Sequence, residues 1–393
     1  MDRRTCLRLG AAITAGAFTQ SSLWTRAFAA PARGGQGPYG PLLDADANGL
    51  MLPAGFTSRV VARAQQEVAD SGYVWPIFPD GGATYRTSGG WIYVANSESI
   101  PGGVSALRFS LRGDVVDAYS ICSGTVLNCA GGRTPWGTWL TCEEVAGGHV
   151  WECDPTGRRQ ARRLPALGTF KHEAAAVDPR TSQVYLTEDE PDGRLYRFVP
   201  ERRRSLDAGE LQVAVVGEDG VVTWRPVPEP NPEIPGSGTP TRRQVPESTS
   251  FSGGEGIVHD RGRIWFTTKG DGKVREYDLR TRRMSLAYDP NEDPVRQLTG
   301  VDNITTSRAG DLVVAEDGGN MELVLLTQDG VAAPLVRVLD QDGSELAGPA
   351  FDPSGRRLYF SSQRGDGVGI TYEVSGPFRR STGAPTRDLP RLS

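Results

Sequence analysis

The sequence contains only three histidines (His149, His172 and His259) and no hydrophobic run long enough to cross a membrane. Three imidazoles are too few for a zinc centre built from histidines, so any metal must be held mainly by other side chains. The net charge of -5 argues against a nucleic-acid partner. We therefore expect neither a nucleic-acid-binding protein nor a protein anchored in a membrane.

The first 30 residues have the features of an export signal. Arg3 and Arg4 form a twin-arginine pair, an apolar Ala-rich stretch follows, and small residues near 27–29 would suit a signal peptidase. We predict export by the twin-arginine pathway to the periplasm or the extracellular space. Residues 31–393 would then form the mature protein, a single domain.

Short strands that end in charged side chains recur along the chain. Glu98, Glu143 and Glu188 lie 45 residues apart, and the later strand ends Lys269, Glu316 and Arg364 follow at intervals of 47 and 48 residues. A repeat of this length with Gly-rich turns is typical of a β-propeller. The sequence therefore predicts an all-β fold with six blades, at about residues 78–121, 129–166, 170–227, 252–290, 300–340 and 346–375.

Two departures from the repeat concern the ends and the middle of the chain. A strand at 55–62 is expected to pair with residues 369–374 and so to close the ring, while residues 31–54 would form an extended leader on the outside. Between the third and fourth strand ends the spacing is 81 residues, and the excess falls at 200–250, around the Pro-rich stretch 226–235. We predict an extended insertion there, without a core of its own.

Acidic side chains are expected to gather at one mouth of the propeller channel. In an up-and-down blade the start of the innermost strand and the end of the second strand lie on the same face. The innermost strands begin with Asp80, Glu173, Glu255 and Asp302, and the second strands end with Glu98, Glu143, Glu188 and Glu316. Two carboxylates 5 Å apart repel by about 3 kcal/mol at an effective dielectric constant near 20, so either cations bind there or several acids are protonated.

The kind of metal depends on the ligand atoms. Oxygen-rich clusters favour calcium, whereas a thiolate such as Cys142, at a strand end next to Glu143, favours a transition metal. The alternative is a buried structural cysteine followed by a solvated acidic turn. His172 lies at a predicted channel position, and we expect it to orient Glu173 or a neighbouring acid rather than to bind metal.

Several motifs along the chain point to one family. They lie at residues 128–144 (including Thr-Cys-Glu-Glu at 141–144), 170–179, 185–189, 193–198, 255–257, 302–304 and 361–364. Together they resemble the PhoX family of secreted alkaline phosphatases. The resemblance implies a twin-arginine-exported six-bladed propeller with a multinuclear centre of iron, as Fe(3+), and calcium, as Ca(2+). It assigns the iron-binding thiolate to Cys142. The expected metal ligands are Cys142, Glu143, Glu98, Glu173, Glu188, Glu255, Asp302 and Glu316.

The same resemblance implies a small-molecule phosphoester as substrate. We expect a metal-activated oxide or hydroxide to attack phosphorus, and Arg364, Lys171 and Lys269 to stabilise the charge that develops on the phosphoryl oxygens. The alternative for these three cations is a structural role in ion pairs with neighbouring acids. The protein is expected to be a monomer.

The cysteines of the mature chain are Cys122, Cys129, Cys142 and Cys153. If Cys142 is a metal thiolate, three remain and at most one disulfide forms, for which Cys122 and Cys129 would close a short loop. Two disulfides without a thiolate ligand are the alternative.

Two other functions fit part of the pattern. The segments 255–257 and 302–304 and the six blades also resemble calcium-dependent lactonases and arylesterases of the gluconolactonase and paraoxonase kind, whose sites contain no cysteine. A propeller that binds a ligand without catalysis is the third possibility. The Thr-Cys-Glu-Glu stretch favours the phosphatase over the lactonase, and the third possibility leaves the ring of acids unexplained.

Overall fold

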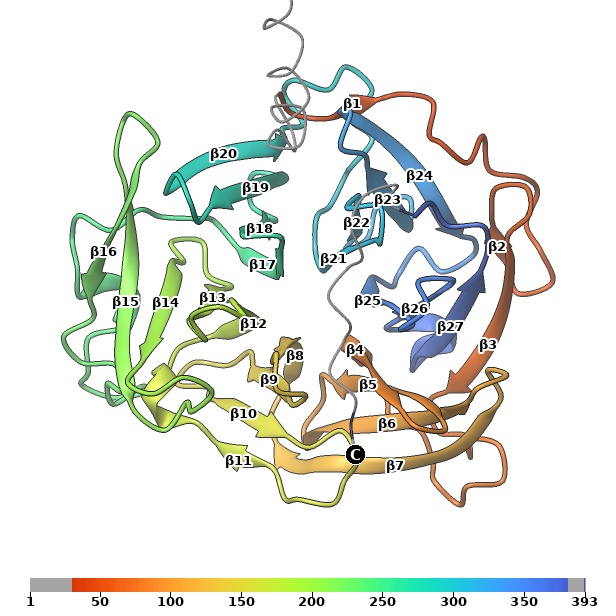
Figure 1. Ribbon diagram of the computed structural model, residues 1–393, viewed down its shortest axis with the longest axis horizontal. Helices are drawn as coiled ribbons and strands as arrows, with labels where there is room; N and C mark the ends of the chain where they lie inside the picture. Colours follow the sequence, from red (N-terminus) through yellow and green to blue (C-terminus); the bar gives the residue numbers. More distant parts are fainter. Residues whose placement is uncertain (1–29, 381–391, 393) are drawn as a thin grey trace, which may run out of the picture.

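The computed structural model describes residues 30–380 and residue 392. In this part of the chain, six β-sheets surround a common axis, and the only helices are three short 3-10 turns (Figure 1). The predicted all-β, six-bladed propeller is confirmed. The predicted twin-arginine signal lies outside the described residues except for Ala30.

The blades follow one another in chain order, each an antiparallel sheet with its first strand innermost. Blade 1 contains β4 (Pro79–Thr87), β5 (Gly90–Ser97), β6 (Gly102–Ser110) and β7 (Val115–Thr125). Blade 2 contains β8 (Asn128–Arg133), β9 (Trp139–Glu143), β10 (Val150–Cys153) and β11 (Arg162–Arg163). Blade 3 contains β12 (His172–Val177), β13 (Val184–Glu188), β14 (Leu195–Pro200), β15 (Gly209–Val216) and β16 (Val222–Pro226).

The second half of the ring has the same plan. Blade 4 contains β17 (Gly254–Asp260), β18 (Arg263–Thr268), β19 (Lys273–Asp278) and β20 (Arg283–Tyr288). Blade 5 contains β21 (Ile304–Thr306), β22 (Leu312–Ala315), β23 (Glu322–Leu326) and β24 (Val331–Val338). Blade 6 contains β25 (Leu346–Phe351), β26 (Arg357–Ser362) and β27 (Ile370–Ser375). The 3-10 turns are η1 (Pro165–Leu167), η2 (Thr241–Arg243) and η3 (Gly365–Gly367).

Strands from the N-terminal part complete the last two blades. β3 (Thr57–Arg63) pairs antiparallel with β27 and supplies the fourth strand of blade 6, as predicted. The shorter strands β1 (Arg33–Gly34) and β2 (Leu50–Met51) both pair with β24 at the outer edge of blade 5. The leader is therefore hydrogen-bonded to the propeller, and the ring is closed by strands from opposite ends of the chain.

The segment at 200–250 differs from the prediction in its first half. Residues 209–226 form the two outer strands of blade 3, β15 and β16, with Leu211, Val213 and Val222 buried. Apolar residues alternate with polar ones there, which suits an outer strand with one buried face. Beyond β16 the chain follows the predicted extended course until β17, although Val245 still packs against the core between blades 2 and 3.

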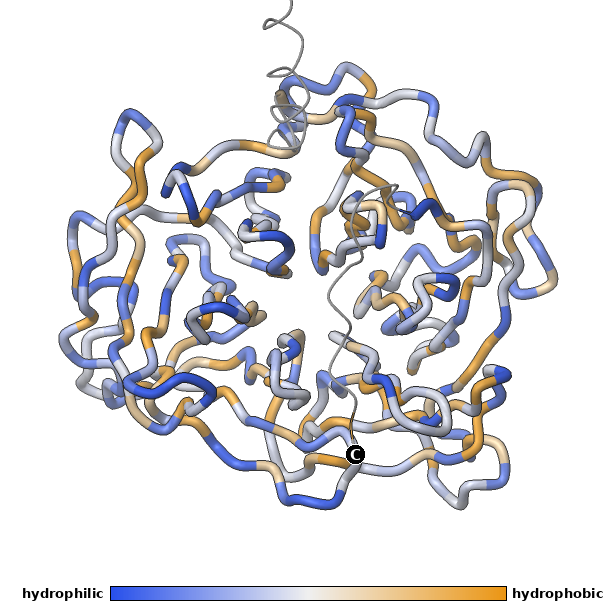
Figure 2. Tube along the Cα trace, viewed as in Figure 1, coloured by the Kyte–Doolittle hydropathy of each residue, from blue (hydrophilic) through white to orange (hydrophobic). Residues whose placement is uncertain are grey.

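The hydrophobic core is divided among the contacts between blades. The described residues contain six clusters of buried apolar side chains, and each lies mainly between two adjacent blades. Trp91 of blade 1, for example, stacks on Phe109 and donates a hydrogen bond to the Tyr359 hydroxyl of blade 6. In Figure 2 hydrophobic stretches lie along the strands, and many outer loops are hydrophilic. Apolar packing thus holds the blades side by side and leaves the strand ends free for polar groups.

Among the described residues, no helix has the length and hydrophobicity that a membrane span needs.

Candidate metal centre

Five innermost strands have a β-bulge close to their start. The register shifts between Pro79 and Gly82, Asn128 and Gly131, His172 and Ala175, Gly254 and Ile257, and Ala347 and Ala350. A bulge places two residues opposite one on the neighbouring strand and redirects a side chain. The first bulge residue of blades 1 to 4 is Asp80, Cys129, Glu173 and Glu255 respectively. Equivalent positions around the ring therefore carry potential metal ligands.

These side chains meet in three groups whose ligand atoms all lie within 4.8 Å of one another. The groups are Cys129, Glu144 and Glu173; Asp80, Glu98 and Glu345; and Glu173, Glu255 and Asp302. Glu173 belongs to two of them, and Asp80 of the third lies near enough to Glu173 and Asp302 for its charge to raise their pKa values. We call the three groups together the acidic mouth. Six blades contribute to it, since Asp80 lies in blade 1 and Glu345 directly precedes β25 of blade 6.

Several carboxyl groups of the acidic mouth have pKa values above their usual range. Burial, followed by the charge of Glu255, raises the pKa of Glu173 well above its usual range. Burial and neighbouring carboxylates do the same for Asp80, Glu255 and Asp302. Burial and the nearby Glu144 raise the pKa of Glu98 to about 7. Without added cations these acids therefore hold protons at pH values where a free carboxyl group would be ionised.

The donor atoms fit metal ions. The Cys129 thiol donates a 3.2 Å hydrogen bond to Glu173 Oε1, whereas Glu173 Oε2 is buried without any hydrogen-bond partner. Burial, then the charge of Asp80, raises the pKa of the Cys129 thiol. A buried carboxylate oxygen without a partner is costly unless a cation or proton neutralises it. One sulfur among several oxygens is a donor set for a transition metal beside calcium.

The structure corrects the prediction for Cys142. Its side chain is 0% exposed and packs in the apolar cluster between blades 2 and 3, with Leu140, Val150 and Leu186. Cys142 lies opposite the bulge that contains Cys129, because Glu143 pairs with Asn128 and Thr141 pairs with Gly131. The two cysteines thus neighbour each other across the sheet, but only Cys129 reaches the acidic mouth.

Three predicted acids, Glu143, Glu188 and Glu316, also lie outside the three groups. Each accepts a hydrogen bond from the backbone N–H six residues later, at His149, Arg194 and Glu322 respectively. A carboxylate at the end of a second strand therefore holds the loop that leads to the third strand. Repetition of the same bond in three blades explains why these acids recur at a regular spacing without being part of the metal cluster.

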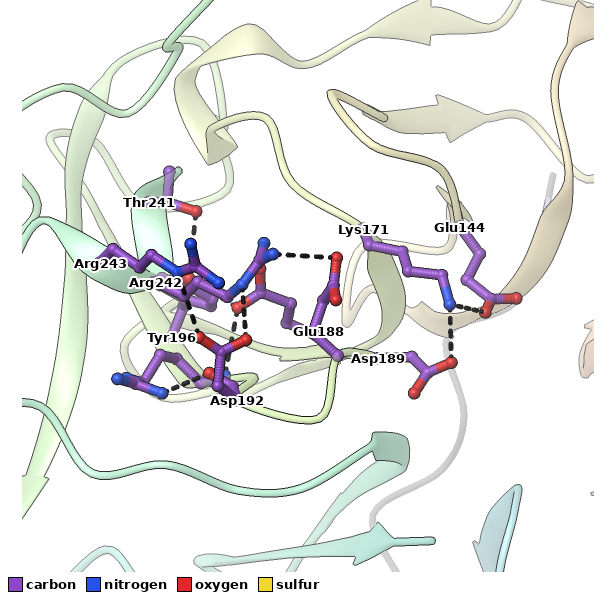
Figure 3. A network of polar contacts seen from close by, with 11 residues as sticks. Glu144, Lys171, Glu188, Asp189, Asp192, Tyr196, Thr241, Arg242 and Arg243 are labelled. Carbon is purple, nitrogen blue, oxygen red and sulfur yellow. Dashed lines mark hydrogen bonds and ion pairs between the residues drawn. The ribbon is translucent and has the colours of Figure 1, made fainter. Parts of the chain in front are cut away.

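Glu188 and Asp189 show how adjacent acids take different directions (Figure 3). Glu188 accepts hydrogen bonds from Tyr196 at 2.9 Å and from Arg242 at 3.2 Å, on the side of the 227–250 segment. Asp189 turns the other way and pairs with Lys171 at 2.8 Å. The extended segment is thus fixed to blade 3 through Arg242, while Asp189 belongs to the rim of the acidic mouth.

The three predicted catalytic cations lie at this rim, and each joins two acids. Lys171 contacts Glu144 at 2.9 Å as well as Asp189. Lys269 contacts Glu255 at 2.7 Å and Asp189 at 3.1 Å.

Arg364 pairs with Glu345, lies 3.9 Å from Glu98 and stands over the ring of Phe78. Its side chain is 44% exposed, against 30% for Lys171 and 40% for Lys269, so all three remain accessible to a ligand.

The sequence prediction missed Cys129, Glu144, Glu345 and Asp189. Cys129 could have been found, because it follows the first residue of β8 just as Glu173 follows the first residue of β12. Glu144 and Asp189 each follow the last residue of the second strand of a blade. The sequence prediction took the last strand residue as the ligand and so missed the residue after it. Nothing in the sequence alone marks Glu345.

Two side chains near the cluster have structural roles. Asn96 donates to the backbone carbonyls of Cys129 and Ala130 at 2.9 and 2.7 Å and accepts from Trp139 at 2.9 Å, so it fixes the bulge that presents Cys129. His172 was expected to orient an acid. Instead it contacts the Gly168 carbonyl at 3.1 Å, and burial lowers its pKa to about 3.

The four cysteines are free thiols in this structure. Cys122 and Cys153 pack in the same cluster between blades 1 and 2 and share a thiol hydrogen bond. The predicted partner of Cys122, Cys129, points instead into the acidic mouth. The pairing of Cys122 with Cys129 is therefore replaced by a contact between Cys122 and Cys153.

Comparison with known proteins finds one family model and several solved structures that are similar to this chain. The model of the family "Alkaline phosphatase PhoX" matches residues 95–148 and 145–277. Pseudomonas fluorescens PhoX in complex with vanadate, a transition state analogue, has the same fold, with a TM-score of 0.69, 16% identity, and coverage of 86% of this chain and 97% of that chain.

Other solved structures are less similar. The PQQ domain of a pyranose dehydrogenase from Coprinopsis cinerea matches with a TM-score of 0.51 and 13% identity, over 84% of this chain and 98% of that one. A putative gluconolactonase matches with a TM-score of 0.49 and 13% identity, over 84% of this chain and 96% of that one. No curated protein matches the sequence significantly. The matched residues include Cys129, Glu144, Glu173 and Glu255, and over residues 95–277 the chain is similar to the PhoX family of alkaline phosphatases.

Proposed function

We propose that the chain is a metal-dependent phosphoester hydrolase whose active site is the acidic mouth. The observation that carries the proposal is the cluster of buried and partly buried acids with one thiol and accessible cations at its rim, in a chain that the PhoX family model matches over residues 95–277. The related Pseudomonas fluorescens PhoX binds vanadate, and a site that is negative in the absence of metal would accept a phosphoester only after cations had reversed its charge.

The donor set supports iron together with calcium. Cys129, Glu144 and Glu173 would hold Fe(3+), since their group contains the only thiol of the cluster. The all-oxygen groups around Asp80 and Asp302 would hold Ca(2+). When bound, the metals would polarise the phosphoryl oxygens and supply an activated water-derived nucleophile.

The rim cations would position the substrate. Lys171, Lys269 and Arg364 are each held between two carboxylates, which fixes the direction of their N–H groups before substrate arrives. Bound metals would engage the same carboxylates. The N–H donors of the three cations would then be released from their ion pairs and could bind the phosphoryl oxygens. Such preorganised donors stabilise the charge that builds in the transition state.

The lactonase alternative is less well supported. It needs an asparagine oxygen on calcium, and Asn303 is the candidate at the acidic mouth. The Asn303 side chain already accepts a 2.8 Å hydrogen bond from the Gly348 N–H and donates one to Asp302 at 2.8 Å. A lactonase site would also leave the group around Cys129 without a purpose.

A matched pair of variants tests the function. Glu173→Gln and Glu316→Gln are isosteric changes of two fully buried glutamates, one inside the acidic mouth and one outside it. We expect Glu173→Gln to lose bound metal and the hydrolysis of p-nitrophenyl phosphate, and Glu316→Gln to keep both. Hydrolysis of a lactone but not of the phosphoester by the unmodified protein would refute the proposal.

Export and assembly are further parts of the proposal. Arg3 and Arg4 and the apolar stretch after them support twin-arginine export to the periplasm or beyond. The exported protein would be a monomer, and its net charge of -5 argues against a nucleic-acid partner. Replacing both arginines by lysine should retain the protein in the cytoplasm. Light scattering of the mature protein should give the mass of one chain.

A further inference from the structure

The other end of the propeller axis has the opposite charge. A cavity of about 770 Å³ opens there, lined by the far halves of the innermost strands and the turns that follow them. In three blades an acid at the acidic mouth is followed six residues later by an arginine at this cavity: Asp80 and Arg86, Glu255 and Arg261, Asp302 and Arg308. Six residues of strand extend up to about 20 Å, so the two ends are well separated.

Arginines outnumber acids around the cavity. The lining includes five arginines, Arg86, Arg133, Arg180, Arg261 and Arg308, but only two aspartates, Asp260 and Asp352. Asp352 accepts hydrogen bonds from the backbone N–H groups of its own turn, at Arg356 and Arg357. Asp260 lies 3.5 Å from Arg261, and Arg180 lies 3.6 Å from Asp178. The acids that are present are therefore already engaged.

Three of the arginines, Arg86, Arg133 and Arg308, have no carboxylate partner among residues 30–380 and 392. Arg86 and Arg308 each donate to the Pro353 carbonyl, and Arg86 Nε is buried without any hydrogen-bond partner. Arg133 stands over the ring of Tyr85, 4.8 Å from its centre, and burial lowers its pKa. All three are partly buried, where water compensates a charge less well than it does at the surface.

We propose that this cavity, which we call the arginine mouth, is a second ligand site that binds a phosphate-class oxyanion. Guanidinium groups bind tetrahedral oxyanions through paired N–H donors, and three of them without counter-charges provide the donors and the charge that such an anion needs. The volume lies within the range of small-molecule sites, so an organic phosphate fits as well as the free ion. The proposal does not depend on the activity of the acidic mouth.

Calorimetric titration of the mature, metal-loaded protein tests the site, with inorganic phosphate and phenylphosphonate as probes. The protein used for the titration should retain its C-terminal residues, because Leu392 donates its N–H to the Arg86 carbonyl beside the cavity. We expect one binding event that the double variant Arg133→Gln and Arg308→Gln weakens at least about tenfold, the loss typical of one charge-assisted hydrogen bond. Stronger binding of phenylphosphonate would identify an organic phosphate as the ligand, and equal or weaker binding would identify the free ion.

Controls separate this event from binding at the metals. The variant with lysine at both positions keeps the charge but not the paired guanidinium donors, so it should bind more tightly than the glutamine variant and less tightly than the unmodified protein. Arg225→Gln removes an outer arginine that pairs with Glu247 and should change nothing. Inhibition of p-nitrophenyl phosphate hydrolysis by phenylphosphonate should be the same in all variants. Unchanged binding in the glutamine variant, or loss of every event on removing the metals, would overturn the proposal.

Discussion

Exchange of the two neighbouring cysteines for serine gives the sharpest test of the metal centre. In Cys129→Ser the hydroxyl can still donate to Glu173, whose oxygen lies 3.2 Å from the present sulfur, so the blade should remain stable. A serine hydroxyl does not ionise as a thiolate does, and the soft ligand is lost. We expect the variant to lose the transition metal and keep most of its calcium.

Cys142→Ser should give the opposite result. Its side chain is fully buried among Leu140, Val150 and Leu186, and a hydroxyl there has no partner in the surrounding apolar cluster. Burial of an unpaired hydroxyl costs about 1–3 kcal/mol. The variant should therefore unfold at a lower temperature or denaturant concentration while its metal content stays normal.

Elemental analysis and thermal unfolding of both variants, beside the unmodified protein, decide the question. The prediction is a crossed pattern, with metal lost in one variant and stability lost in the other. If Cys142→Ser removed the iron and Cys129→Ser retained it, the assignment of the thiolate to the bulge of β8 would be refuted.

Three further results are expected. Arg364→Ala should lower phosphoesterase turnover by about a hundredfold, the scale for one transition-state donor, with metal content intact; unchanged turnover would assign Arg364 to its ion pair with Glu345 alone. In the metal-free protein, burial raises the pKa of Glu98 from 4.5 to about 7. Proton binding by Glu98 therefore contributes to the stability of the folded state, and this contribution is fully present below pH 4.5 and is lost as the pH rises through 7. Metal-free protein should therefore melt at lower temperature at pH 8 than at pH 5, and a flat profile would contradict the burial of charge. Oxidation should join Cys122 to Cys153, leaving two thiols by titration with a thiol reagent under denaturing conditions; four would show that the pair stays reduced.

The sequence predicts the ring well because the information is repeated. Six strand ends define the blades, with four of the five intervals between them at 45–48 residues, and Asp80, Glu173, Glu255 and Asp302 mark the start of four innermost strands. The closing strand is also predictable, since a strand from the start of the chain commonly completes the last blade of a propeller. Errors in a single repeat have little effect on the count of blades.

Side-chain direction is much harder to predict, because one residue of register reverses it. Glu143 and Glu144 are adjacent, yet the first holds a loop and the second joins the acidic mouth. Cys129 and Cys142 belong to one motif, and only the bulge decides which thiol faces the axis. A family motif identifies the segment that contributes a ligand, whereas the choice of atom needs the local backbone.

Closure of the ring by β3 and β27 also has a consequence for biogenesis. The group of Asp80, Glu98 and Glu345 joins the first blade to the beginning of the last, at the same seam that β3 completes. Glu345 is synthesised long after Asp80, so no ribosome-bound intermediate that lacks the sixth blade can contain this group. A cation bound there would bridge the seam and favour the closed ring over the open one. Loading of this group, unlike loading of the other two, should thus report that the whole ring has been made and closed.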